Sequence, residues 1–230
     1  MKVRISFQKN GPVKFIGHLD TMRFFQKLIR RAGIPAAYSE GFSPHQKLSF
    51  AQALGVGVES EGEYFDLELK DDLVSGLTSD EIIRRLNEHS VEGIAVIDCV
   101  KLPEKSKNAM ASVFAADYLV RLREGFLPSF DLKKAVEDFN LKESARIIKK
   151  TKKTNRDLEL KELVYKLEMK EDAVFMRLNA SSANSVKPAL IMEYLFNENG
   201  CEYDPLSSMI TRLDIYDENM KPLAASGVHF

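Results

Sequence analysis

Cysteine is scarce in this 230-residue sequence, which contains only Cys99 and Cys201. The two lie far apart, and neither belongs to a Cys-x-x-Cys motif. A disulfide framework and iron–sulfur ligation by clustered cysteines within the chain are therefore excluded. We expect a protein of a reducing cytosol that binds no cofactor and carries out no redox catalysis of its own.

Long apolar runs are also missing. No segment approaches the roughly 18 apolar residues of a membrane span, and the N-terminal MKVRISFQKN lacks the apolar core of a signal peptide. We therefore predict a cytoplasmic protein that does not contact a membrane. The common nucleotide and nucleophile signatures are absent too, because no Walker loop or Gly-x-Ser-x-Gly elbow occurs and Gly55-Val56-Gly57 has no Rossmann continuation.

Excess charge of either sign is the third absence, since the formal net charge is only −1. The total neither supports nor excludes a polyanionic partner, so the local distribution of charge matters more. With 44% hydrophobic and 29% charged residues, the composition is that of an ordinary globular protein. At about 100–200 residues per domain, the length allows two modest domains.

Hydrophobic periodicity predicts an α+β fold made of two tandem ferredoxin-like (βαββαβ) units with antiparallel sheets. We place the first domain at residues 1–104 and the second at residues 112–230, joined by a linker around Pro103. The expected first-half elements are a strand at 2–8, a helix from about 19 to 32, a strand at 63–70, a helix at 78–87 and a strand at 94–100, with a short strand at 36–38. Those of the second half are strands at 115–123, 145–153, 158–169, 173–178 and 209–216, and helices at 131–139 and 186–197.

The first helix has an apolar stripe and a basic side. Its period predicts that one face is buried; this face comprises Leu19, Met22, Phe25, Leu28, Ile29 and Ala32. Basic side chains fall on the other side, namely Arg23, Lys27, Arg30 and Arg31. Such a row contacts phosphates in nucleic-acid-binding proteins, but it is also typical of a solvated helix face.

A polar loop follows the helix, between residues 38 and 47. It combines Tyr38, Phe42, His45 and Lys47 with fixed backbone positions at Gly41 and Pro44, a composition suited to holding a ligand. We predict that Tyr38 and Phe42 stack on bases of a single strand. Two other aromatic residues near the basic helix, Phe15 and Phe50, are expected in the core.

A second basic run lies in the other half of the chain. It consists of Lys149, Lys150, Lys152, Lys153 and Arg156, placed where two strands should meet in a hairpin. Cations concentrated on a protruding hairpin provide a phosphate-binding surface, although lysines also protect an exposed sheet edge from aggregation. Together with the basic helix, this run makes RNA or DNA contact a hypothesis of equal weight to the structural alternative.

His18, Asp20 and His45 are the candidate catalytic residues, because they could form an acid–base or metal-binding group. The structural alternative is that Asp20 stabilises the helix N-terminus and His18 bonds locally. Residues two apart on a helix do not share a face, which makes His18 and Asp20 a poor chelate. We therefore favour the structural role and predict no metal site.

Several motifs in the first 70 residues resemble the signature of the radical SAM-linked protein family. They are Lys9-Asn10-Gly11-Pro12, Gly17-His18-Leu19-Asp20, Arg30-Arg31-Ala32-Gly33-Ile34-Pro35, Gly41-Phe42-Ser43-Pro44-His45 and Gly55-Val56-Gly57-Val58-Glu59-Ser60. Many members of that family carry Ser where this chain has Gly17. The family is a bacterial domain of unknown function, free-standing or fused to the C-terminus of B12-binding radical SAM proteins.

The resemblance implies a noncatalytic accessory protein that binds RNA, or presents a substrate, for a radical SAM enzyme in RNA or ribosome modification or maturation. RNA or a ribosomal component is the expected second partner. Two alternatives stay open. One is an RNA-processing or RNA-modifying enzyme centred on His18, Asp20 and His45, and the other is an adaptor that only docks a protein partner.

Overall fold

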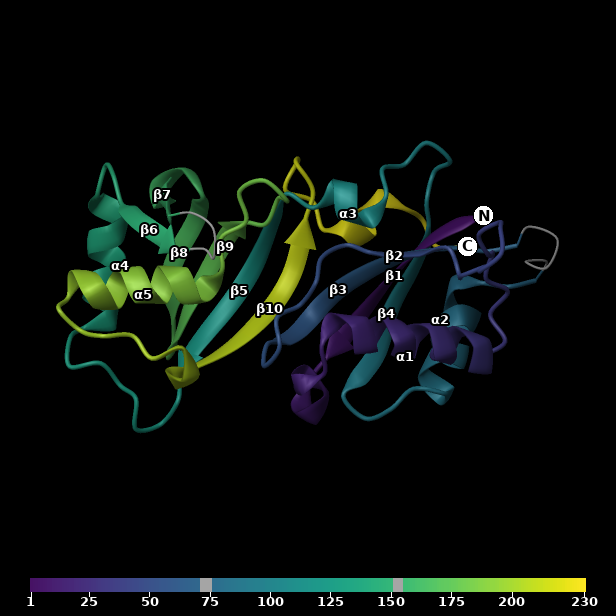
Figure 1. Cartoon of the computed structure of the whole chain (residues 1–230), viewed down its shortest axis with the longest axis horizontal. Helices are drawn as coiled ribbons and strands as arrows, with labels where there is room; N and C mark the ends of the chain where they lie inside the picture. Colours follow the sequence, from purple (N-terminus) through teal and green to yellow (C-terminus); the bar gives the residue numbers. More distant parts are fainter. Residues whose placement is uncertain (71–75, 151–154) are drawn as a thin grey trace. The chain divides into compact units, whose positions relative to one another are not determined.

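The computed structural model describes residues 1–70, 76–150 and 155–230, with side chains left out at 149–150 and 155–156. The chain divides into two compact units (Figure 1). Unit 1 comprises Met1–Phe114 and Arg212–Phe230, and unit 2 comprises Ala115–Thr211. The domains 1–104 and 112–230 remain a prediction. In the structure, however, residues 212–230 group with the N-terminal unit.

Unit 1 has an antiparallel sheet with helices packed on it. Strand β1 pairs with β3 on one side and with β4 on the other, and the short β2 also pairs with β3. The part of β10 that belongs to unit 1 lies beside β3. Its elements are β1 (Lys2–Lys9), η1 (Gly11–Phe15), α1 (His18–Arg31), β2 (Leu48–Phe50), β3 (Glu59–Glu68), α2 (Ser79–Glu88), β4 (Ile94–Lys101), α3 (Ala109–Ser112) and η5 (Leu223–Ser226).

The core of unit 1 is built around aromatic rings. Phe7, Phe25, Phe50 and Phe65 pack with ring centroids 4.5–6.0 Å apart. Aromatic pairs at such separations add stabilisation beyond the burial of their surface. The prediction that Phe50 lies in the core is confirmed.

Helix α1 matches the predicted span but not the whole predicted stripe. Phe25, Leu28, Ile29 and Ala32 are buried, whereas Leu19 is 66% exposed. Thr21 is buried in its place, because the contact face passes through positions 21, 25, 28, 29 and 32, which keep the helical spacing. The helix ends before Gly33, whose φ of +63° suits a glycine at this position.

The alternation of apolar and polar residues along β1 is typical of a half-buried strand, which would leave Arg4 and Ser6 on a solvated face. This is wrong, because both are buried as completely as Val3, Ile5 and Phe7 on the other face. The polar face is covered by segments distant in sequence: Arg4 donates hydrogen bonds to the Leu223 carbonyl and to Ser226 Oγ. Alternation along one strand cannot reveal such a cover.

Unit 2 contains an antiparallel sheet in which β9 lies between β5 and β8. Residues 208–211 of β10 belong to this unit, and β10 is adjacent to β5 in the sheet. Helices α4 and α5 contact each other through Phe139 and Tyr194, whose ring centroids are 5.7 Å apart. The elements are β5 (Ala115–Leu122), α4 (Leu132–Leu141), β6 (Arg146–Lys150), β7 (Asn155–Glu159), η3 (Leu160–Glu162), β8 (Val164–Lys170), β9 (Ala173–Asn179), α5 (Pro188–Glu198), η4 (Pro205–Ser207) and β10 (Ser208–Tyr216).

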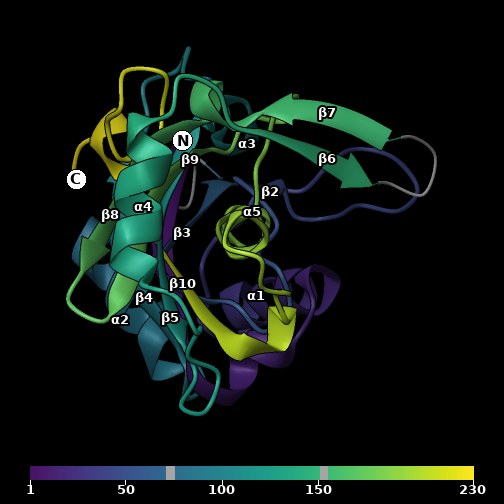
Figure 2. The same cartoon turned by 90° about the vertical axis from the view of Figure 1, so that its left-hand side faces the viewer.

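The prediction of one long strand at 158–169 is wrong in one respect. The strand is broken into β7 and β8 by the 3-10 turn η3. The Glu159 carboxylate accepts hydrogen bonds from the Lys161 and Ala145 amides, which fixes the turn. As a result β6 and β7 form a separate two-stranded sheet, a hairpin that extends from the rest of unit 2 (Figure 2).

The fold is thus mixed α+β and mostly antiparallel, with α1 to α5 as the α-helices of the described residues. The expected helix start at residue 78 is confirmed, since the Thr78 side chain accepts the Glu81 amide. Asp131 caps α4 in the same way by accepting the Lys134 amide. None of the described helices has the length and apolar character needed to cross a lipid bilayer.

Candidate nucleic-acid interface

The basic side of α1 faces solvent. Arg23, Lys27, Arg30 and Arg31 are all exposed, as predicted. Two of them have weak attachments: Arg23 Nη1 lies 3.5 Å from Asp20 Oδ1, and Arg31 Nη2 donates to the His89 carbonyl at 3.1 Å. At 1.5 Å per residue the row is about 12 Å long, so it can contact several groups along an anionic chain.

The loop between residues 38 and 47 is a small hairpin closed by backbone hydrogen bonds. Tyr38 and Gln46 form an isolated antiparallel bridge. The Ser39 amide donates to the His45 carbonyl at 2.8 Å, and the Lys47 amide donates to the Ala37 carbonyl at 2.9 Å. Phe42, at the end of the loop, is fully exposed, and Tyr38 is 40% exposed. Both rings are therefore accessible for stacking.

Phe15 adds a third exposed aromatic side chain, which corrects the expectation that it lies in the core. It is 63% exposed at the end of η1, and Lys14 Nζ lies 5.6 Å from its ring centroid. No residue of η1 is fully buried, and its apolar contact with the core is made by the partly buried Val13 rather than by Phe15. In such an arrangement the ring can stack on a base, and the cation beside it can attract the phosphates of the same strand.

The three candidate catalytic residues each have a local contact. The His18 ring packs edge-on against Phe50 at a centroid distance of 5.4 Å. Asp20 faces Arg23, and His45 Nδ1 lies 2.9 Å from Ser39 Oγ. No group of three or more His, Cys, Asp and Glu side chains among the described residues is arranged to hold a metal ion.

The structure contains buried charged side chains near His18 that the sequence did not predict. Lys9 Nζ donates to the Ile16 carbonyl at 2.7 Å, and Arg212 binds Glu63 through Nε at 2.6 Å and Nη2 at 2.5 Å. Burial lowers the pKa of Lys9, and the charge of Glu63 partly opposes this. The adjoining cavity of about 10 Å³ has room for about one water molecule. The sequence signal was that Lys9 continues the buried positions 3, 5 and 7.

The basic hairpin is described through its backbone. Lys149 pairs with Arg156, and Lys150 pairs with Asn155, across β6 and β7. The hairpin position of Lys149, Lys150 and Arg156 is therefore confirmed, whereas Lys152 and Lys153 lie outside the described residues.

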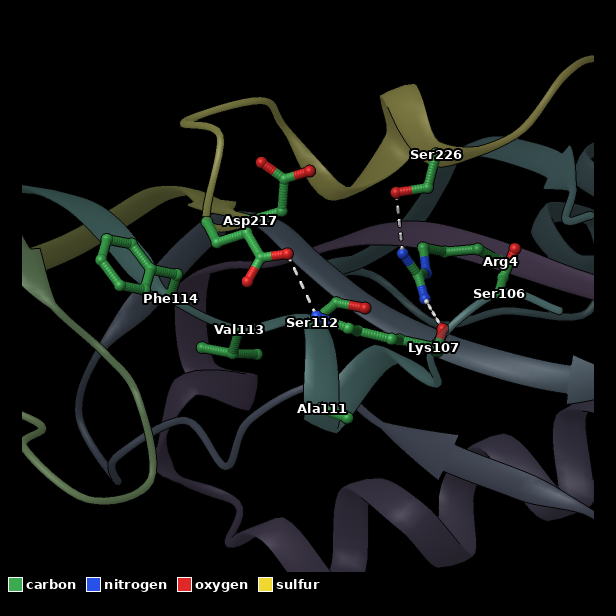
Figure 3. Close-up of a pocket in the computed structure, with 10 residues that line it drawn as sticks. Arg4, Ser106, Lys107, Ala111, Ser112, Val113, Phe114, Asp217 and Ser226 are labelled. Atoms are coloured by element: carbon green, nitrogen blue, oxygen red, sulfur yellow. Dashed lines mark hydrogen bonds and ion pairs between the residues drawn. The ribbon is translucent and has the colours of Figure 1, made fainter.

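A cavity of about 310 Å³ in unit 1 was also missed by the sequence analysis (Figure 3). The Arg4 guanidinium at its wall is already bound by the protein, through Asp66, the Leu223 and Lys107 carbonyls and Ser226. The Lys107 ammonium, which also lines the cavity, lies 3.1 Å from Glu218 Oε1. Asp217 and Glu218 also line the cavity, so it offers an anionic ligand less net positive charge than α1.

Comparisons with known proteins give a family but no function. A family model described as "Uncharacterized protein conserved in bacteria (DUF2344)" matches residues 2–188. None of the curated proteins matches the sequence. A solved structure titled "Crystal Structure of a Cbf5-Nop10-Gar1 Complex" matches 94% of this chain with 11% identity and a TM-score of 0.47. The alignment spans half of the chain in that complex, and a similarity this low supports no assignment.

Proposed function

The chain belongs to the DUF2344 family of uncharacterized proteins conserved in bacteria, and we propose that it binds single-stranded RNA as a noncatalytic accessory protein of a radical SAM enzyme. The reaction served would be RNA or ribosome modification or maturation. The observation that carries the RNA-binding part is the exposed basic row of α1, in the same unit as three exposed aromatic rings. The radical SAM partner is inferred from the motif resemblance alone.

The solvent exposure of the basic side chains of α1 supports contact with phosphates. Lys27 and Arg30 are exposed, and the contacts of Arg23 and Arg31 are exposed to solvent as well. Exposed ion pairs are worth little, so an RNA phosphate can replace Asp20 beside Arg23 at small cost. Each replacement would release a condensed counterion from the RNA, which makes binding favourable and dependent on salt.

Single strands are favoured over duplexes by the aromatic side chains. Phe15, Tyr38 and Phe42 expose their rings, and unpaired bases stack on such rings with little dependence on sequence. We propose His45 and Lys47 of the same loop as further contacts. The β6–β7 hairpin, with Lys149, Lys150, Lys152, Lys153 and Arg156, is proposed as a second phosphate-binding element.

A noncatalytic role is supported by the contacts of the candidate catalytic residues. His18 packs on Phe50, and His45 bonds to Ser39 within its own loop. Asp20 lies in the first turn of α1, where its charge is favourable at the N-terminus of the helix. Each residue thus has a structural explanation that needs no substrate.

We further propose that both halves of the chain are ferredoxin-like, in domains near 1–104 and 112–230. In support, unit 1 follows β1, α1, β2, β3, α2, β4 along the chain, and β1 and β3 occupy the centre of its sheet. Unit 2 repeats the scheme with β5, α4, β8, β9, α5 and β10, and the β6–β7 hairpin is an insertion.

The RNA-binding proposal is tested by the salt dependence of affinity. Fluorescence anisotropy with a short single-stranded RNA of mixed sequence would be measured between about 50 and 200 mM salt. Changing Arg30 and Arg31 to Ala should weaken binding. It should also make the negative slope of log affinity against log salt less steep by about 1.4, at about 0.7 per lost contact.

The matched control changes Arg84 and Arg85 to Ala on α2 of the same unit. These side chains lie outside the proposed interface, and Glu81 and Glu88 offset their charge, so their loss should leave the slope unchanged. Salt-independent binding, or equal effects of the two double variants, would contradict the proposal. The partner is tested separately by affinity purification from native cells with and without ribonuclease. If no radical SAM enzyme is recovered under either condition, the proposed partner is contradicted.

A further inference from the structure

Gln46 is buried without hydrogen bonds. The residue is 5% exposed, and neither Nε2 nor Oε1 has a hydrogen-bond partner among the described residues. An amide that has lost its water contacts without gaining protein partners destabilises the closed conformation of its loop. Buried polar groups in this state call for a specific explanation, and a ligand that satisfies the amide is one.

Tyr38 lies directly across from Gln46. The two residues form an antiparallel bridge, and the flanking hydrogen bonds run from Ser39 to His45 and from Lys47 to Ala37. This pattern makes Tyr38 and Gln46 a non-hydrogen-bonded pair, in which opposite side chains share one face and lie closest together. An amide and a 40% exposed aromatic ring are thus neighbours on the same side of the loop.

This pair has the chemistry of a base-reading site. A ring offers a stacking platform to a base, and a glutamine amide presents an acceptor and a donor side by side. That arrangement matches N6–H and N7 of adenine in a bidentate contact. We propose that Tyr38 and Gln46 form a subsite for one adenine of single-stranded RNA, with Tyr38 stacking on the base and Gln46 bonding to its N6/N7 edge.

The base reaches Gln46 when the loop opens. Beyond the bridge, the side-chain bonds at the loop are those between Ser39 Oγ and the Nδ1 and backbone N of His45, at 2.9 and 3.1 Å, and both are exposed to solvent. Opening of the loop between Ser39 and His45 breaks these two contacts and one backbone hydrogen bond of the bridge, and gives the Gln46 amide access to partners. The remaining bond from Lys47 to Ala37 keeps Gln46 next to Tyr38. Lys47, the next residue, holds the loop to β3 through its ion pair with Glu68 at 2.9 Å.

The inference rests on the proposed RNA binding and adds base selectivity to it. The test compares labelled oligo(A), oligo(U) and oligo(C) of equal length by anisotropy at one salt concentration. Wild-type protein should bind oligo(A) about tenfold more tightly than oligo(U) or oligo(C). The variant Gln46→Met should lose this preference through weaker binding of oligo(A), while its affinity for oligo(U) stays the same.

The thermal unfolding midpoint of Gln46→Met should be equal to or above that of the wild type, because methionine fills similar space without a buried amide. A lower midpoint would mean that Gln46 is structural and would overturn the subsite. Tyr38→Leu provides a second test and should weaken binding of all three oligonucleotides. The control Gln8→Met, on β1, should keep the preference for oligo(A).

Equal wild-type affinity for the three oligonucleotides, or a preference for U or C, would overturn the adenine subsite and leave the proposed RNA binding intact. Absence of binding to all three would remove both. Loss of the oligo(A) preference in Gln8→Met as well as in Gln46→Met would also count against the assignment, since the effect would then not belong to the loop.

Discussion

Arg4 of β1 and Asp66 of β3 form a buried bidentate ion pair, with Nε 2.8 Å from Oδ1 and Nη2 3.2 Å from Oδ2. Asp66 also accepts the Ala109 amide at 2.7 Å, and Arg4 binds the carbonyl of Leu223. The pair therefore connects the sheet of unit 1 with α3 and with η5, segments far apart along the chain.

Removal of the Asp66 carboxylate should destabilise the protein strongly. Asp66→Ala leaves a buried guanidinium without its counter-charge, so the free energy of unfolding should fall by about 3–5 kcal/mol. Urea denaturation followed by circular dichroism measures this change. As a control, Asp172→Ala breaks an exposed pair with Arg121 and should cost no more than about 1 kcal/mol. Similar losses in both variants would refute a special role for the buried pair.

Phe42→Ala should separate binding from stability. The ring is fully exposed, so the free energy of unfolding should change by less than about 0.5 kcal/mol. If the ring stacks on a base, affinity for single-stranded RNA should fall by about 1–3 kcal/mol. Anisotropy and urea denaturation on the same sample give both numbers. Unchanged affinity would exclude Phe42 from the interface.

The pair of His229 and Asp98 should make stability depend on pH. His229 Nε2 lies 2.7 Å from Asp98 Oδ1, and this hydrogen bond, together with the carboxylate charge, raises the pKa of His229 above its ordinary 6.5. Because the folded-state pKa is higher than the unfolded one, the stabilisation is fully present below about pH 6.5 and is lost as the pH rises through the raised pKa.

Asp98→Asn is the appropriate variant for this test, since an asparagine can still accept the Cys99 amide that Asp98 binds at 2.8 Å. An NMR titration should show the pKa of His229 moving back toward its ordinary value. The difference in unfolding midpoint between the two proteins should shrink at alkaline pH. Identical titration curves would show that the pair does not form in solution.

The two cysteines should differ sharply in reactivity. Burial, with a smaller effect of the Asp98 charge, raises the pKa of Cys99 to about 12. At about pH 8 its thiolate fraction is then on the order of 10⁻⁴, whereas Cys201 is only half-buried. Iodoacetamide followed by peptide mass spectrometry should label Cys201 alone in the native protein and both residues in concentrated guanidinium. Native labelling of Cys99 at the rate of Cys201 would disprove its burial.

Local signals in the sequence predicted most of the elements and part of the candidate site. The start of α2 at Thr78, the end of α1 at Gly33 and the exposed cations of α1 all depend on neighbours within a few residues. The loop was also found from its composition. Gln46 was passed over within it, because a polar residue between His45 and Lys47 gives no sign of burial. Its position opposite Tyr38 depends on how the loop closes.

The sequence by itself determined the α+β class, most of the helices and strands, and the concentration of cations on α1 and around the β6–β7 hairpin. These follow from periodicity, capping and turn chemistry, which are local. The tertiary structure decided that Gln46 is buried, and that Arg4 and Lys9 are buried and bonded by segments beyond their own strand. It also broke the expected strand at η3, left Phe15 exposed and grouped residues 212–230 with unit 1. Burial and pairing depend on contacts between distant parts of the chain. The pattern of residues along one element does not show which distant segment will cover it.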